Sequence, residues 1–263
     1  MTVFDKLDTI RAKVDAKRNE PLFSEEIRSL ENRYQTTVTS EQNNLLRVMA
    51  KLICYSNNAP SDKVTQLIDS RKFERIFHDF ELTALAKEDP ENIIDSEWHN
   101  LTAIRFKKKI PAIIRCAKLL QDGGSTTIES IYSGNKLPVE LKTESDIDNF
   151  WLCFDLMLAK YEKQEMPHFK NMTTLLHLLL HLGFPCVKPD LIVMKVAALI
   201  GLVPTRENLN TYRPVERKIV VKTIQQYCLS RNIKPAVMDL YFLVFGGQKD
   251  SLKYVNGFIP FSI

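Results

Sequence analysis

The chain has 263 residues, of which 44% are hydrophobic and 26% are charged, and its 36 basic and 32 acidic residues give a net charge of +4. This composition is ordinary for a globular protein, and with only 8 glycines and 12 prolines it excludes a collagen-like or linker-dominated chain. The length suits one large domain or two lobes, and the small positive charge permits nucleic-acid binding without requiring it.

Apolar residues recur at helical spacing along almost the whole chain. Residues 3–18, for example, place Phe4, Leu7, Ile10 and Val14 on one face. Strand-like alternation is nearly absent, so we expect an all-α protein built as two helical lobes. Similar patterns predict further helices, of which the second has Ser40 as its cap and the third has Ser61 or Asp62. The predicted helices cover 41–56, from 61 onward, 72–86, 91–104, 109–121, 125–132, 145–161, 171–182, 190–202, 213–230 and 234–246.

The cysteines are odd in number and isolated, and most of them stand in apolar patterns. This usage is typical of buried, reduced thiols, so we expect an intracellular protein in a reducing compartment, the cytoplasm or nucleoid. No C-x-x-C pair is present, and we therefore expect no metal and no cofactor. The first twenty residues lack a signal-peptide core, and the apolar run 191–203 is short and contains Lys195, so we expect no membrane segment. The five cysteines are Cys54, Cys116, Cys153, Cys186 and Cys228.

Two clusters of polar residues have ordinary structural explanations. His177 and His181 in "HLLLH" would lie on one helix face, but the Glu of a zincin motif is missing, which favours packing over metal binding. The basic run in "RFKKKIPAIIRCAK", residues 105–118, is typical of a solvated face, and it indicates a DNA surface only if other features do.

Asp190 stands between Pro189 and a long apolar helical pattern. An Asp at this position caps a helix by accepting bonds from the first free amides. A catalytic role is the alternative. The two roles are compatible, since the negative charge that favours capping is also available to a bound substrate.

The stretch "EMPHFKNMTTLLHLLLHLGFPCVKPD" resembles the helix-hairpin-helix DNA glycosylase superfamily. That family has a hairpin L-P-G-[VI]-G-x-x-[ST]-A, a helix, and then a catalytic Asp about 23 residues beyond the Pro. Here Met166 and Pro167 take the L-P places, Thr173 takes the [ST] place, and Asp190 lies 23 residues after Pro167. The stretches "LICYSNNAPSDKVTQLI", "IRFKKKIPAIIRCAKLL" and "SRNIKPAVMDLYFLVFGG" are similar to other family segments, and the resemblance covers about residues 40 to 247 in order.

The resemblance implies a fold and an activity. The fold would have one lobe over 46–183 and a second over 1–45 plus 184–263, with a DNA cleft between the two lobes. The activity would be a monofunctional DNA N-glycosylase of base excision repair, because Met172 stands where bifunctional members have a Schiff-base Lys. It would flip a damaged base out of the duplex and hydrolyse its glycosidic bond, with Asp190 as the catalytic carboxylate.

Further site residues follow from their places in the family pattern. Asn58 in "SNNAP" would fill the gap left by the flipped nucleotide. His168 and Lys170 stand where the family has its two hairpin glycines. The residues expected to hold the DNA backbone are His168, Phe169, Lys170 and Lys188, and those expected in the base pocket are Met172 and Trp151, with core packing as the alternative for Trp151.

The expected partner is double-stranded DNA with a damaged base, bound by a monomer. Alkylated purines are the favoured lesion, because the chain lacks a Schiff-base Lys and iron–sulfur cysteines and a cationic base suits an aromatic pocket. The alternatives are a glycosylase for oxidised or mismatched bases, and a non-catalytic helical protein that binds DNA or acts as a scaffold.

Overall fold

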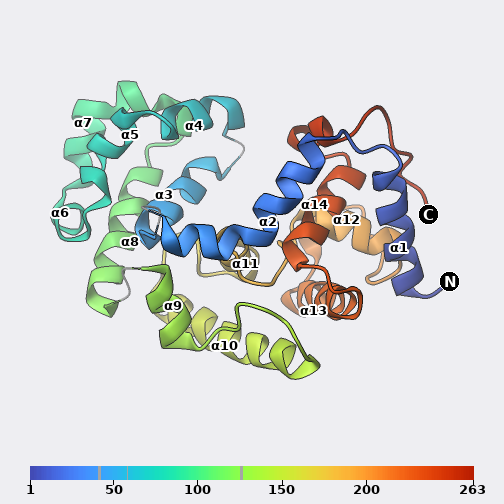
Figure 1. Cartoon of the computed structure of the whole chain (residues 1–263). Helices are drawn as coiled ribbons and strands as arrows, with labels where there is room; N and C mark the ends of the chain where they lie inside the picture. The colour runs from blue at the N-terminus through green and yellow to red at the C-terminus, as the bar shows by residue number, and fades with distance from the viewer. Residues whose placement is uncertain (41–42, 58, 125–126) are drawn as a thin grey trace. The chain divides into compact units, whose positions relative to one another are not determined.

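The computed structural model describes residues 1–40, 43–57, 59–124 and 127–263, which form two compact helical units (Figure 1). The described residues contain two isolated β-bridges, Arg18 with Val255 and Asn44 with Thr127, but no strand. The all-α class predicted from the periodicity is therefore confirmed. Among the described helices, none has the length and apolar character needed to cross a membrane.

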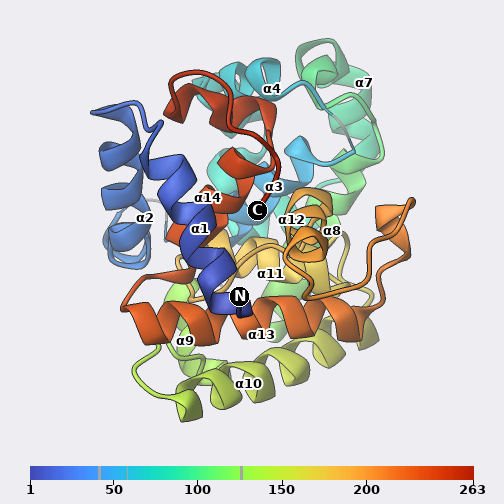
Figure 2. The same ribbon diagram turned by 90° about the vertical axis from the view of Figure 1, so that its right-hand side faces the viewer.

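Unit 1 consists of Met1–Thr36, Leu137–Cys153 and Met172–Ile263, and its central helix is α14, Pro235–Phe245. Every residue of α14 except Leu243 is buried, as expected for a helix whose residues other than Asp239 are apolar or aromatic. Figure 2 shows α1, α12 and α13 lying around α14, and all three pack against it. The other elements are α1 (Val3–Asp15), α2 (Leu22–Thr39, whose last residues belong to unit 2), α11 (Met172–His181), α12 (Leu191–Leu199), η3 (Leu209–Thr211), α13 (Pro214–Arg231) and η4 (Lys249–Tyr254).

Unit 2 consists of Thr37–Lys136 and Phe154–Asn171, and its central helix is α8, Lys109–Gly123. Helices α3, α6 and α7 pack against α8. The helices of this unit are α3 (Leu45–Tyr55), α4 (Ser61–Ile68), α5 (Arg71–Ile76), η1 (His78–Phe80), α6 (Leu82–Lys87), α7 (Pro90–Leu101), η2 (Thr102–Ile104), α9 (Ile128–Asn135) and the second half of α10 (Glu144–Lys163), which begins in unit 1.

The division into units differs from the predicted lobes 46–183 and 1–45 plus 184–263. Residues 137–153 and 172–183 belong with the terminal segments, because their side chains pack there: the indole Nε1 of Trp151 donates to Gln225 Oε1 at 2.8 Å. Residues 37–45 belong with unit 2, where the Asn44 side chain donates to the carbonyl of Phe80 at 3.0 Å.

Three predicted helix boundaries are corrected by local hydrogen bonding. The cap of α3 is Asn44, which accepts from the amide of Arg47, and Ser40 instead follows the end of α2. Ser61 and Asp62 lie inside the first turn of α4, after Pro60. The predicted helix 72–86 is broken into α5, η1 and α6, since residues 78–80 have positive φ angles.

A tight bend at Gly183 joins α11 to the segment that leads to Asp190. Gly183 has φ +88°, and the amide of Phe184 donates to Leu179 O at 2.9 Å, which is the bonding of a left-handed helix end. A Cβ atom added at Gly183 would lie 2.3 Å from the backbone nitrogen of Tyr34 in α2. The bend therefore needs glycine both for its φ angle and for its close approach to α2.

Candidate active site

Asp190 is the N-cap of α12, as its place in the sequence predicts. Its backbone is extended, and its Oδ1 accepts from the amides of Ile192 at 3.0 Å and Val193 at 3.2 Å. These amides are the ones that a helix leaves without intrahelical partners. One carboxylate oxygen is therefore fixed in direction by the start of the helix.

The second oxygen of Asp190 has a different environment. Its Oδ2 lies 3.4 Å from Nζ of Lys188, and the side chains of Lys188 and Asp190 are 29% and 24% exposed. An ion pair this accessible is worth only about 0–1 kcal/mol, because solvent screens it and the lysine loses side-chain freedom. Lys188 can therefore leave Oδ2 at little cost when another group approaches.

Two charged side chains hold the residues that lead into Asp190. Asp239 of α14 accepts from the amide of Lys188 at 2.9 Å. Arg217 of α13 donates to the carbonyl of Pro189 at 2.5 Å and to Oγ1 of Thr173 at 3.3 Å. The amide of Lys188 and the carbonyl of Pro189 lie on either side of the Lys188–Pro189 peptide link. They are thus bonded to two different helices, α14 and α13.

Asp239 is the only charged residue of α14, and it is 6% exposed. Burial is the largest cause that raises the pKa of Asp239, to about 7, and the negative charge of Asp190 raises it further. The hydrogen bond from the Lys188 amide and the positive charges of Lys188 and Arg33 act in the opposite direction. A carboxyl group at this position therefore changes charge near neutral pH.

We expect the stability of the protein to fall, relative to an Asp239→Asn variant, as the pH rises from about 4 to 7. The folded Asp239 keeps a proton that the unfolded chain has already released, so folding becomes less favourable over this range. At pH 8 the free energy of unfolding has fallen, relative to that of Asp239→Asn, by at most on the order of 4 kcal/mol. Urea unfolding of the wild type and of Asp239→Asn at pH 5 and pH 8 measures this fall. If the difference in unfolding free energy between the two proteins is the same at both pH values, the assignment is contradicted.

The hairpin "PHFKN" belongs to unit 2 and has a left-handed residue at the place of the first family glycine. His168 has φ +67°, and the amide of Phe169 donates to Pro167 O at 2.8 Å. The ring of Phe169 is fully buried, so its predicted DNA contact would have to come from its backbone. Lys170 is exposed, and His168 is partly exposed.

Both residues predicted for the base pocket are buried in unit 1. Trp151 is 3% exposed, with its indole bonded to Gln225 and Nζ of Lys218 4.9 Å from its ring centre. Gln225 in turn donates to the carbonyl of Pro185 at 2.8 Å. Met172 is 9% exposed at the start of α11. Trp151 thus has the core position that the sequence left open as the alternative, and a pocket role would require it to leave these bonds.

Asn58, the predicted wedge, lies outside the described residues. The segment just before it is held by Lys109, which is 2% exposed and donates to the carbonyls of Cys54 at 2.8 Å and Ser56 at 2.6 Å. Lys109 belongs to the basic run 105–118, which the sequence predicts to be a solvated face. The sequence only weakly indicates that Lys109 is buried, because nothing in "RFKKKIP" distinguishes it from the two exposed lysines before it.

The histidines and cysteines show no arrangement that would hold a metal ion. The rings of His177 and His181 lie edge to face with centres 4.7 Å apart, and across the described residues no three His, Cys, Asp or Glu side chains come together as metal ligands. All five cysteines are buried, and none of the five is in a disulfide bond. Burial raises the pKa of the Cys54 thiol to about 12, which disfavours a reactive thiolate.

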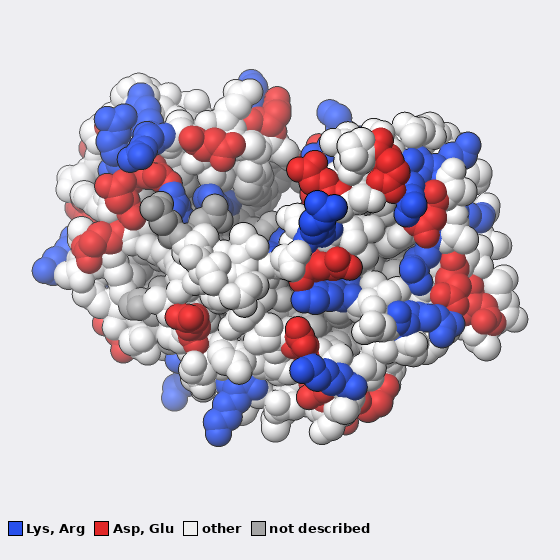
Figure 3. All heavy atoms as spheres, in the orientation of Figure 1, with Lys and Arg blue, Asp and Glu red and all other residues white. Residues whose placement is uncertain are grey.

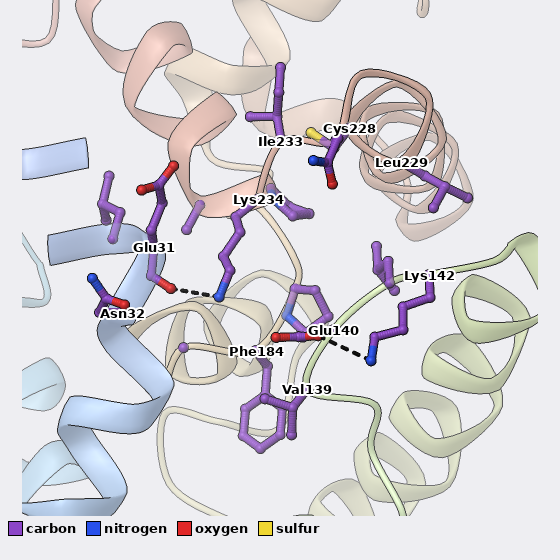
Figure 4. Close-up of a pocket in the computed structure, with 17 residues that line it drawn as sticks. Glu31, Asn32, Val139, Glu140, Lys142, Phe184, Cys228, Leu229, Ile233 and Lys234 are labelled. Atoms are coloured by element: carbon purple, nitrogen blue, oxygen red, sulfur yellow. Dashed lines mark hydrogen bonds and ion pairs between the residues drawn. The ribbon is translucent and has the colours of Figure 1, made fainter. Parts of the chain in front are cut away.

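A pocket of about 630 Å³ lies within unit 1 (Figure 4). Its walls come from α2, the loop before α10, the bend after α11 and the turn between α13 and α14. Nζ of Lys234 donates to the carbonyl of Glu31 at 2.6 Å, and Lys142 lies 3.5 Å from the carboxylate of Glu140. Within the described chain, none of the predicted site residues lines this pocket, and its mixed charges indicate no particular ligand.

The structure brings only some of the predicted residues together. Lys188 and Asp190 are paired in unit 1, whereas the hairpin residues 168–170 belong to unit 2. On the face drawn in Figure 3, Lys and Arg lie interspersed with Asp and Glu rather than forming a field of one sign. No family model, curated protein or solved structure matches the chain.

Proposed function

We propose that the protein is a monofunctional DNA N-glycosylase with Asp190 as its catalytic carboxylate. The observation that carries this proposal is the asymmetry of that carboxylate. Oδ1 is fixed by two helix amides, while Oδ2 has only a weak ion pair with Lys188 and lies in a partly exposed position. A carboxylate held by one oxygen and accessible by the other is suited to face a reacting sugar.

The chemistry follows from the charge that develops on the sugar. As the glycosidic bond breaks, the base leaves with the electron pair of that bond, and positive charge develops on the deoxyribose. The negative charge of Asp190 stabilises this cation. Oδ2 also accepts a hydrogen bond from water, whose oxygen bonds to C1′ while its proton passes to the carboxylate. No imine forms, because Met172 cannot supply an amine.

The lesion is proposed from the sequence alone, with alkylated purines favoured. Single-lesion duplexes that carry alkylated, oxidised or mismatched bases, each incubated with excess protein, test both the activity and its specificity. Release of one class of base supports the proposal and identifies the substrate. If no base is released from any duplex in the panel, the glycosylase proposal is wrong.

One observation favours a non-catalytic DNA-binding or scaffold protein as the second candidate. Both oxygens of Asp190 already have partners, and the hairpin amide of Phe169 bonds within its own turn, so cap and hairpin are each complete without DNA. Under this alternative the protein binds undamaged and damaged duplexes alike and releases no base.

Lys170→Ala is expected to weaken DNA binding about equally across sequences and to reduce the salt slope by about one unit. Lys170 is an exposed cation in the hairpin, and each phosphate contact releases roughly one counterion. Lys188→Ala is expected to reduce the slope by less, because its ammonium is already paired with Asp190.

The measurement is fluorescence anisotropy on one duplex at several salt concentrations. Lys249→Ala is the control, since Lys249 is an exposed lysine outside the hairpin, and we expect it to change neither affinity nor slope. An unchanged slope in Lys170→Ala would show that the hairpin does not hold DNA.

A further inference from the structure

We propose that Asp239 and Arg217 are positioning residues that set the location and direction of the Asp190 carboxylate. The proposal rests on the glycosylase function above, because positioning matters only if Asp190 acts on a substrate. It stands on geometry: the two residues bond the peptide groups on either side of the Lys188–Pro189 link, immediately before Asp190.

Asp239 occupies a place where an apolar residue would pack more easily. Every other buried residue of α14 is apolar or aromatic, and burying a carboxyl group costs free energy unless it is bonded. Its partner is the backbone amide of Lys188, so the bond fixes the chain rather than a side chain. The position of Asp239 is itself fixed, because α14 is packed on several sides by α1, α12 and α13. The residue therefore connects the central helix of unit 1 to the entry of α12.

Arg217 fixes the other side of the same link. Its guanidinium spans Pro189 O and the hydroxyl of Thr173, and its Nε donates to the carbonyl of Tyr212 at 3.3 Å. The three acceptors come from the segment before Asp190, from α11 and from the turn between η3 and α13, so a single planar group holds three parts of unit 1. Burial lowers the pKa of Arg217, and the negative charge of Asp190 acts in the opposite direction.

The two bonds leave Asp190 little freedom to move. Its own Oδ1 is bound to α12, and the backbone before it is bound to α13 and α14, so three helices determine where Oδ2 lies. A displacement of about 1 Å in a catalytic group can cost about a hundredfold in rate. Loss of either bond should therefore lower the rate of base release and leave DNA affinity unchanged.

The test compares variants that keep or remove each bond. Asp239→Asn keeps an acceptor oxygen for the Lys188 amide, and we expect its single-turnover excision rate to stay within about threefold of the wild type, whereas Asp239→Leu should lose about 10- to 100-fold. Arg217→Lys keeps the charge but cannot span Pro189 and Thr173 together, and a loss of about tenfold or more is expected. DNA dissociation constants should change less than twofold in all three variants.

A second readout does not depend on excision. Hydrogen exchange of the Lys188 amide, followed by NMR, should be slow in the wild type and in Asp239→Asn, and at least tenfold faster in Asp239→Leu. Asp146→Leu is the control, because the carboxylate of Asp146 also accepts from backbone amides, those of Lys142 and Thr143, but at the start of α10 and not at the entry of α12. It should alter neither the exchange of Lys188 nor the excision rate.

The outcomes separate this proposal from the proposed function. If the wild type releases no base, the glycosylase function fails, and the exchange of Lys188 alone decides whether Asp239 holds the chain. If the wild type is active but Asp239→Leu and Arg217→Lys excise at its rate, neither residue positions Asp190, and the proposal is overturned. It is equally overturned if Asp239→Leu leaves the exchange of Lys188 unchanged. If Asp239→Leu does not fold, the folded Asp239→Asn variant is the test. A loss of excision in Asp239→Asn as large as that in Arg217→Lys would contradict the role of the acceptor oxygen at position 239.

Discussion

Asp190→Asn is expected to reduce base release by about a thousandfold, since it removes the charge that stabilises the cationic sugar. The substitution keeps the shape of the side chain, and the amide oxygen of Asn can still accept from Ile192 and Val193, so α12 stays capped. It gives up the ion pair with Lys188, which is worth at most about 1 kcal/mol. Folding and DNA affinity should therefore remain close to those of the wild type.

The measurement is a single-turnover excision assay on the duplex that the wild type cleaves best, together with thermal unfolding and DNA binding. Asp89→Asn is the matched control, because Asp89 caps α7 by accepting from the amide of Glu91 and belongs to no predicted site. Undiminished excision by Asp190→Asn would remove this carboxylate from the mechanism. An equal loss in Asp89→Asn would show that helix capping, and not the charge of Asp190, is responsible.

Gly183→Ala is expected to destabilise unit 1 by about 2–5 kcal/mol, a large part of the stability of a typical domain. The φ angle of +88° alone costs an L-residue about 1–2 kcal/mol. The new methyl group would also lie 2.3 Å from the backbone nitrogen and 2.5 Å from Cα of Tyr34, so α2 or the bend would have to move. Overpacking that displaces backbone costs a further 1–3 kcal/mol or more, by about the usual scale.

Gly247→Ala is the control for the φ angle. Gly247 also stands two residues beyond the end of a helix, its amide also donates to the carbonyl three residues before it, and its φ is +75°, but a Cβ atom there meets nothing within 4 Å. We expect this variant to lose only about 1 kcal/mol. Urea unfolding of both variants separates the two effects; equal losses would mean that α2 does not press on the bend.

The sequence predicts helices well where one apolar face is continuous, as in α1 and α8. It misses α2, which buries only Phe23 and Leu30 along its 18 residues and is otherwise polar. It also joins α5, η1 and α6 into one helix, because periodicity does not reveal that residues 78–80 take left-handed angles. The bounds of the two units differ from those of the predicted lobes for a similar reason, since contacts such as Trp151 with Gln225 join segments far apart in the chain.

The candidate site is predicted only in part. Asp190 can be found because Pro189, an acid and an apolar helix follow one another in the chain, which is a local signal. Asp239 and Arg217 cannot be placed in the same way, because their partners lie 51 and 28 residues away. A single acid inside the apolar run "PAVMDLYFLVF" is nevertheless a signal, since a buried charge needs a partner.

The order of assembly during synthesis follows from the way unit 1 is composed of three separate stretches. Residues 1–36 emerge from the ribosome before the rest of unit 1, yet their partners lie far along the chain: Tyr227 and Tyr241 donate to Asp8 and Asp15, and Lys6 donates to the carbonyl of Ile200. At about 5–20 residues per second, the apolar face of α1 waits on the order of ten seconds or more for α14. Most of unit 2, residues 37–136, is complete long before then and depends on fewer distant partners. We therefore expect unit 2 to become stable before unit 1, and α1 to be a segment that chaperones bind in the meantime.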